Sequence, residues 1–139
     1  MKKGVQVGLE KTISFRVTEA KTVPSLYPES EEFRSMPPVF ATGFMVGFME
    51  WACIEALKPF MDEGEGSVGT MINVTHEAAT PVGMVVEATA RCTAIEGKKI
   101  SWEVIARDEV DIIGRGTHER FVIDYAKFNA RLAAKAGAK

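Results

Sequence analysis

One stretch of apolar residues limits the folds that this chain can adopt. Residues 43–54 are apolar on nearly every side of a helix, and such a helix must be covered by other elements. We predict the helix over about 41–60, because Thr42 is a good N-cap at its entrance and Pro59 ends or bends it. The rest of the chain is therefore expected to wrap around this helix.

Glu50 is the one charged residue within that stretch. Its neighbours one turn away on either side are all uncharged: Val46, Gly47, Cys53 and Ile54. Burying an ionised carboxylate costs several kcal/mol unless the group is paired or hydrogen-bonded. We therefore expect Glu50 to have a partner in the folded protein, a function, or both.

The remaining sequence is typical of strands. Residues 5–18 alternate apolar and polar positions, which predicts a first strand before the helix. Four consecutive strands are predicted after it, from 68 to a break at 81–83, then over 84–95, 100–107 and 112–123, with a hairpin turn at 96–99. Residues 128–136 are predicted to form a short terminal helix.

This order predicts an α+β fold in which an antiparallel five-stranded sheet wraps around one long central helix. The 139 residues suit a single domain, 1–139, with one continuous core. A sheet wrapped on one helix still leaves free edges and one free face. We therefore expect two copies of the chain to pair.

Residues 21–38 contain four prolines, which exclude a long regular element. The same segment carries too many apolar side chains for a freely solvated loop. These side chains are Val23, Leu26, Tyr27, Phe33 and Met36. The pattern favours a flap over about 23–38 that closes over something.

Composition excludes several classes of function. The formal net charge is -2 and there is no basic run, so we expect no nucleic-acid partner. Cys53 and Cys92 lie in apolar segments without metal-ligand spacing, which is typical of reduced thiols in a cytoplasmic protein. We expect no metal site, no signal peptide and no membrane span.

Residues 64–69 match the glycine pattern of dinucleotide-binding loops. That loop must follow a strand and open a helix, whereas this one follows a helix and opens a strand. The pattern is therefore interpreted as a connecting turn.

Two histidines are candidates for chemistry. His76 is predicted to share a strand face with Ile72 and Val74, and so to point at the helix; a core histidine with one hydrogen bond is the alternative. His118 lies in a polar cluster and is predicted to have a surface or interface role. If Glu50 and His76 face the same interior, each lowers the cost of burying the other.

Thr42 lies two helical turns before Glu50, a rise of roughly 12 Å, so the two are not expected to touch within one chain. A hydroxyl, a carboxylate and an imidazole are the parts of acyl-transfer chemistry. Bringing Thr42, Glu50 and His76 together would need the strand that bears His76, or a second subunit.

Several segments resemble the hot-dog-fold thioesterases, and more narrowly the fluoroacetyl-CoA thioesterase subfamily. They are residues 39–52, 64–70, 74–81 and 116–120, with 21–23 and 26–30. The resemblance implies a homodimeric hot-dog fold that hydrolyses a short acyl-CoA thioester, above all fluoroacetyl-CoA to fluoroacetate and CoA. It implies no metal or redox cofactor, since coenzyme A is part of the substrate.

The resemblance also implies a site. The subfamily's catalytic residues fall on Thr42, Glu50 and His76, and its substrate-binding residues on Gly69 and Arg120. The pocket would lie at the subunit interface. Glu50 would act as the nucleophile or as the base that activates water, and both remain open.

The flap departs from the subfamily at one position. Phe33 is retained, but Met36 stands where the subfamily has a phenylalanine. Methionine is flexible, so the flap would enclose a small acyl group less rigidly. A generalist short-chain thioesterase is therefore a serious alternative, and a hot-dog hydratase or dehydratase and a non-catalytic acyl-CoA-binding module are two others.

Overall fold

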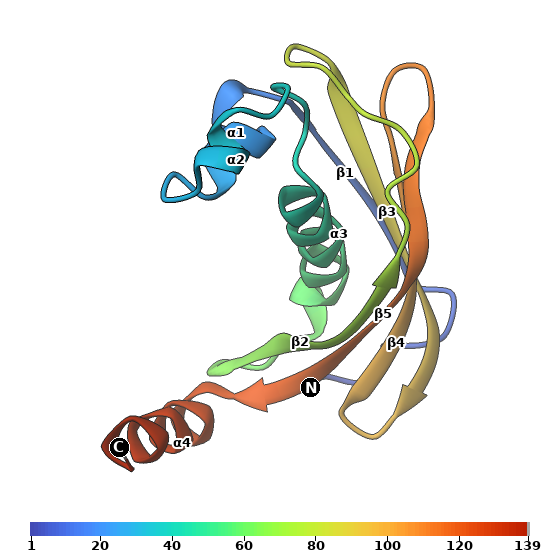
Figure 1. Cartoon of the computed structure of the whole chain (residues 1–139). Coiled ribbons are helices and arrows are strands. Elements are labelled where there is room, and N and C mark those ends of the chain that lie inside the picture. The colour runs from blue at the N-terminus through green and yellow to red at the C-terminus, as the bar shows by residue number, and fades with distance from the viewer. Residues whose placement is uncertain (139) are drawn as a thin grey trace.

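The computed structural model describes residues 1–138. Its main feature is one curved antiparallel sheet that curls around helix α3 (Figure 1). The strands are β1 Glu10–Arg16, β2 Glu65–Val74, β3 Val85–Glu96, β4 Lys99–Arg107 and β5 Ile112–Asp124. They lie in the order β1-β3-β4-β5-β2, so β1 and β2 form the two edges. The predicted five-stranded antiparallel sheet around one long helix is confirmed.

Helix α3 spans Thr42–Leu57 and continues into the 3-10 turn η2, Lys58–Phe60. Together they cover the helix predicted over 41–60. The N-cap residue is Ala41, however, and Thr42 is the first residue of the helix. The capping role predicted for Thr42 is therefore wrong, and its hydroxyl bonds to another part of the chain.

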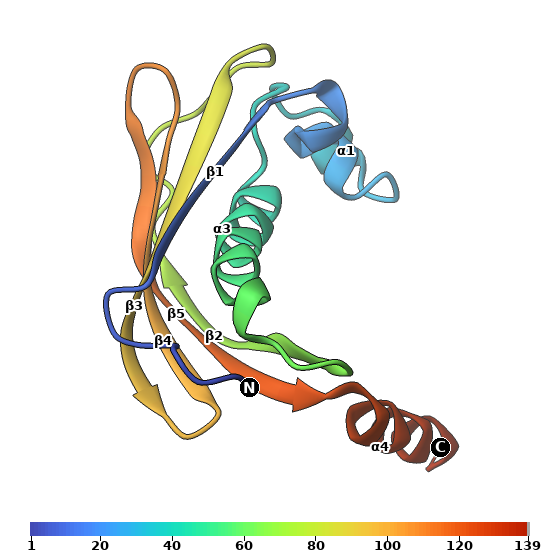
Figure 2. The same ribbon diagram turned by 180° about the vertical axis from the view of Figure 1, so that it is seen from behind.

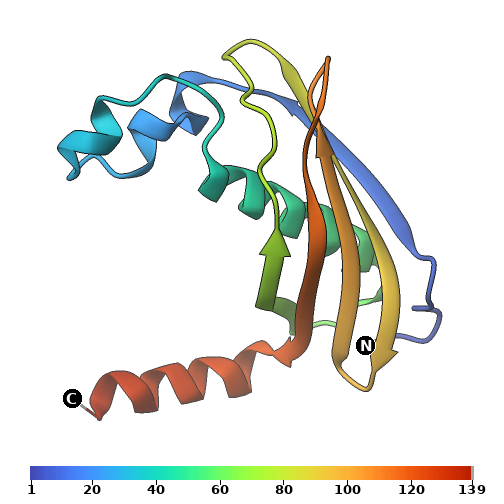
Figure 3. The same cartoon turned by 45° about the vertical axis from the view of Figure 1, so that its right-hand side comes forward.

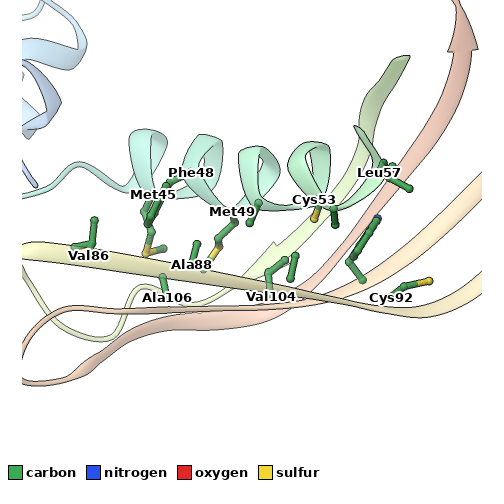
Figure 4. Close-up of a cluster of buried hydrophobic side chains, with 14 of the residues drawn as sticks. Met45, Phe48, Met49, Cys53, Leu57, Val86, Ala88, Cys92, Val104 and Ala106 are labelled. Carbon is green, nitrogen blue, oxygen red and sulfur yellow. The ribbon is translucent and has the colours of Figure 1, made fainter. Parts of the chain in front are cut away.

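The core lies between α3 and the concave face of the sheet (Figure 4). The helix supplies mostly bulky side chains and the facing strands several small ones, so the helix can approach the sheet closely. Residues on the two sides include Met45, Phe48, Met49, Cys53 and Leu57 from α3, and Val86, Ala88, Cys92, Val104 and Ala106 from the sheet.

Strand β2 differs from its prediction in two ways that affect the site. It ends at Val74, so His76 lies beyond the strand rather than on its face. Its register on β5 shifts between Gly69 and Met71, a β-bulge that changes which side chains face the helix. Before the strand, Gly64 has a φ of 82° and forms the predicted connecting turn.

The flap consists of the short elements η1 Glu19–Lys21, α1 Val23–Leu26 and α2 Glu31–Arg34. It lies beside the first turn of α3 (Figure 2). Leu26 packs over Gly43, where an added Cβ would lie 3.1 Å from Leu26 Cδ2. Phe33 packs edge-on against Tyr27 with ring centroids 5.4 Å apart, whereas Met36 is 51% exposed.

The terminal helix α4 spans Tyr125–Gly137 and begins three residues earlier than predicted. The Asp124 side chain caps it by accepting a hydrogen bond from the Lys127 backbone N–H. The helix extends away from the end of the sheet and buries none of its residues (Figure 3). Within residues 1–138, no helix combines the length and apolar character needed to cross a membrane.

Candidate active site

Thr42 and His76 form the first part of the candidate site. Thr42 is exposed at the start of α3, and its Oγ1 lies 2.6 Å from Nδ1 of His76, in the segment that follows β2. Nε2 of His76 is buried and bonds to none of the described residues. Burial lowers the pKa of His76 below its usual value, so the imidazole is neutral at neutral pH. A neutral imidazole beside a hydroxyl can accept its proton.

Glu50 and Arg120 form the second part. Glu50 lies in the third turn of α3, where its side chain is 34% exposed, so the predicted burial is only partial. Arg120 comes from β5 and is only 3% exposed. Its Nη1 donates to Glu50 Oε1 over 2.9 Å. A buried guanidinium therefore holds one carboxylate oxygen, and the carboxylate still reaches solvent.

The rest of the Arg120 guanidinium is also held by the protein. Nε donates to Ser67 Oγ and Nη2 to the Ser67 carbonyl oxygen, both over 2.8 Å. Nη1 lies 3.1 Å from Nε2 of His118, on the same face of β5. Four of the five N–H groups of Arg120 thus have partners within the chain. The guanidinium cannot rotate without breaking several hydrogen bonds.

His118 belongs to this group, and the surface or interface role predicted for it is wrong, because its side chain is only 2% exposed within the chain. The sequence did carry a signal for it. His118, Arg120 and Val122 alternate along β5, which places the two polar residues on the face of the buried valine. The neighbouring polar residues, Thr117 and Glu119, point to the other face.

Gly69 makes room for the carboxylate. An added Cβ at this position would lie 2.5 Å from Glu50 Oε1 and 3.5 Å from Arg120 Nη1. A side chain here would therefore displace Glu50. The family resemblance predicted Gly69 as a substrate-binding residue, and within the chain it also leaves the space that the Glu50 carboxylate occupies.

Two separate open clefts, each of about 260 Å³, lie at these groups. One borders Glu50 and is lined by Val46, Gly69, Thr70, Met71, Ile72 and His118. The other borders Thr42 and His76 and is lined by Val23, Val39, Phe40, Glu77, Ala78 and Ala79. Glu50 and His76 thus do not share one interior within a chain. The predicted Glu50–His76 pair is replaced by the pairs Glu50–Arg120 and Thr42–His76.

The side chains of residues 1–138 contain no cluster of three or more His, Cys, Asp or Glu that could bind a metal ion. The candidate site itself offers a carboxylate at Glu50, a neutral imidazole at His76 and a hydroxyl at Thr42. Such groups activate water or attack a carbonyl carbon.

Sequence comparison places these groups in a known context. The family model described as "Fluoroacetyl-CoA-specific thioesterase" matches residues 17–126. A fluoroacetyl-CoA thioesterase from Streptantibioticus cattleyicolor is 56% identical over 135 residues, which cover 97% of this chain and 97% of that protein.

Solved structures agree with the sequence comparison. A structure of the fluoroacetyl-CoA thioesterase FlK superimposes with a TM-score of 0.94 at 56% identity, covering 96% of this chain and 98% of the other. A thioesterase-superfamily protein from Thermus thermophilus superimposes with a TM-score of 0.85 at 33% identity, covering 99% of both chains. The hot-dog fold predicted from the sequence is thereby confirmed.

Proposed function

The chain belongs to the family of fluoroacetyl-CoA-specific thioesterases, and from this premise we propose that it hydrolyses fluoroacetyl-CoA to fluoroacetate and CoA. The observation that carries the proposal is the half-exposed carboxylate of Glu50, fixed at the edge of a cleft by the buried Arg120. A carboxylate placed in this way is available to a substrate without reorganisation of the protein.

Glu50 performs the central step in this proposal. As a base, it takes a proton from water while the oxygen of that water bonds to the thioester carbonyl carbon. As a nucleophile, its own oxygen forms that bond, and water then cleaves the resulting anhydride. In both cases the carbon–sulfur bond breaks and the CoA sulfur leaves as the thiol. Arg120 keeps one Glu50 oxygen in place and leaves the other to react.

Thr42 and His76 supply the proton transfers in this proposal. Their 2.6 Å contact lets the neutral imidazole accept the hydroxyl proton, so the hydroxyl can hydrogen-bond the reacting centre or act as a relay nucleophile. Gly69 offers its backbone close to the acyl group. Neither metal nor redox chemistry is required for these steps, and CoA enters only as part of the substrate.

We also propose that the enzyme is a homodimer whose pocket joins the two clefts across the subunit interface. Two observations support this. Each chain has Glu50 in one cleft and the Thr42–His76 pair in another. Strand β2, which carries Gly69, is an edge of the sheet, and its Ile72 is 43% exposed. Unpaired strand edges and exposed apolar groups of this kind favour association.

The flap is proposed to cover the acyl group through Phe33 and Met36. Phe33 is half-buried against Tyr27, whereas Met36 is half-exposed and has the flexible side chain of a methionine. A mobile cover discriminates less well between acyl groups of similar size. A generalist short-chain acyl-CoA thioesterase is thus the second candidate.

The cytoplasm is the proposed location, in keeping with two buried thiols that form no disulfide.

Thiol release from fluoroacetyl-CoA and from acetyl-CoA, measured side by side as kcat/KM, tests the proposal. A large preference for the fluorinated substrate supports the specialist, and similar values support the generalist. Saturable binding without release of CoA would indicate a binding module, and hydration of an enoyl-CoA would indicate a hydratase. Glu50→Ala and His76→Ala proteins that stay folded and keep wild-type rates would contradict the roles given to these residues.

A further inference from the structure

We infer that His118 is a positioning residue for the reaction, a neutral hydrogen-bond acceptor that orients Arg120 and, through it, the Glu50 carboxylate. This inference rests on the proposed function, since it assigns the reacting group to Glu50. It adds to the proposed catalytic apparatus a residue that acts on the reacting carboxylate through Arg120.

The protonation state of His118 follows from its two partners. Nδ1 lies 2.6 Å from the Met71 carbonyl oxygen, which can only accept, so Nδ1 carries a proton. Nε2 lies 3.1 Å from Nη1 of Arg120, which can only donate. Both hydrogen bonds form together only if Nε2 is unprotonated. The geometry therefore requires the neutral Nδ1–H tautomer.

The surroundings of His118 favour the same neutral state, mainly because the ring is buried. Burial lowers its pKa and the Arg120 cation adds to the effect, while the Met71 carbonyl and the charges of Glu50 and Glu119 act in the opposite direction. The 4.0 Å approach of Nε2 to Glu50 Oε1 is thus not an ion pair. His118 neither neutralises Glu50 nor exchanges protons with it.

A relay of three hydrogen bonds results. The Met71 carbonyl fixes the imidazole, the imidazole accepts from one Nη1 hydrogen of Arg120, and the other Nη1 hydrogen binds Glu50. Without the acceptor at His118, one N–H of a buried guanidinium is left unpaired. The guanidinium then loses one of the contacts that fix its plane, and the carboxylate loses its fixed direction.

Two amide variants separate the functions of the two ring nitrogens. His118→Gln places an acceptor where Nε2 lies, and His118→Asn places a donor where Nδ1 lies but nothing that reaches Arg120. Glu119→Gln is the matched control, because Glu119 is adjacent to His118 in the sequence but lies on the opposite face of β5. Its Oε2 lies 3.7 Å from Nζ of Lys99. We expect wild-type kinetics from this control.

The kinetic test compares kcat and KM for thioester hydrolysis in the intact 139-residue chain. We expect kcat of His118→Asn to fall by about 10- to 100-fold with KM nearly unchanged, because a misaimed reacting group affects the transition state more than binding. His118→Gln should recover most of that loss. Equal losses in both variants, or no loss in His118→Asn, would overturn the inference.

A second measurement does not depend on activity. The ¹⁵N chemical shifts of the His118 ring in the wild-type protein should show Nδ1 protonated and Nε2 unprotonated at neutral pH. An imidazolium or the Nε2–H tautomer would overturn the inference even if the enzyme is active. If the wild-type protein hydrolyses no acyl-CoA but shows the expected tautomer, the proposed function fails and the hydrogen-bond relay stands.

Discussion

Gly69 lies directly against Glu50, so closely that an added Cβ would be 2.5 Å from Oε1 of the carboxylate. The same Cβ would lie 3.1 Å from Cε1 of His118. The edge strand β2 therefore contributes to the site by lacking a side chain at this position. The residue type is dictated by the space that Glu50 needs, and the backbone at Gly69 is not in the left-handed region.

We predict that Gly69→Ala lowers kcat by about 10- to 100-fold, because the new methyl group pushes the carboxylate away from Arg120. Gly47→Ala is the matched control, since an added Cβ there meets no atom within 4 Å. Because Gly47 lies inside α3, its replacement should stabilise the protein by about 0.5–1 kcal/mol. The kcat and the urea unfolding of both variants test these two predictions. A wild-type kcat in Gly69→Ala would contradict the steric argument.

Two substitutions of Glu50 should abolish activity alike but differ in their effect on stability. Glu50→Gln keeps an oxygen that can accept from Arg120, whereas Glu50→Ala leaves the buried guanidinium without this partner. We expect Glu50→Ala to lower the free energy of unfolding by about 1–3 kcal/mol and Glu50→Gln to lower it by less. Both variants should lose thioester hydrolysis. Equal destabilisation of the two would show that the hydrogen bond to Arg120 contributes little.

Stability should fall in mild acid because of His76 and His118. Burial lowers the pKa of both in the folded protein, so the unfolded chain takes up protons first as the pH drops below about 6.5. The contribution of these neutral histidines to the free energy of unfolding is thus fully present above that pH. It is lost as the pH falls towards their pKa values in the folded protein. Urea unfolding at about pH 7.5 and 5.5 measures the decrease, and most carboxylates stay ionised over this range.

His118→Gln provides the comparison for this pH dependence, because glutamine does not titrate. The decrease in the free energy of unfolding between the two pH values should be smaller in this variant than in the wild-type protein. A wild-type stability that is flat across the range would contradict the prediction.

Cys53 should be unreactive in the native protein. Burial raises the pKa of its thiol to about 12, and the nearby Glu50 charge adds to the effect while Arg120 opposes it. A disulfide reagent at about pH 8 should label Cys53 only after unfolding, because the thiolate is the nucleophile. A Cys92→Ala protein isolates the signal, and rapid labelling of native protein would show that α3 opens readily at this point.

Met36→Phe should make the enzyme more selective. A phenylalanine ring has fewer rotatable bonds than methionine and would pack more rigidly in the flap beside Phe33. We expect the ratio of kcat/KM for fluoroacetyl-CoA over acetyl-CoA to rise, by at most about 10-fold. Phe33→Leu is the complementary variant and should lower the ratio. A ratio unaffected by either change would indicate that the flap does not set acyl selectivity.

Most of the fold was determined by the sequence alone. The apolar run before Pro59 predicts α3, and alternation with well-placed turns predicts all five strands, although β1 starts five residues later than predicted and β2 ends well before the predicted break at 81–83. Glu50 could be identified as unusual from its immediate neighbours. These signals are local, because helix and strand periodicities are carried by residues close together in the chain.

The partners of the site residues were decided by the tertiary structure. Glu50 is 70 residues away from Arg120, and Thr42 is 34 residues away from His76. The pairing of β2 with β5 places Gly69 opposite Arg120, the register shifts directly after Gly69, and the end of β2 at Val74 lets the following segment bring His76 to Thr42. A one-residue change of register would move each side chain to the other face of the sheet. Sequence periodicity gives the faces of a strand, but only packing between distant segments fixes which faces meet.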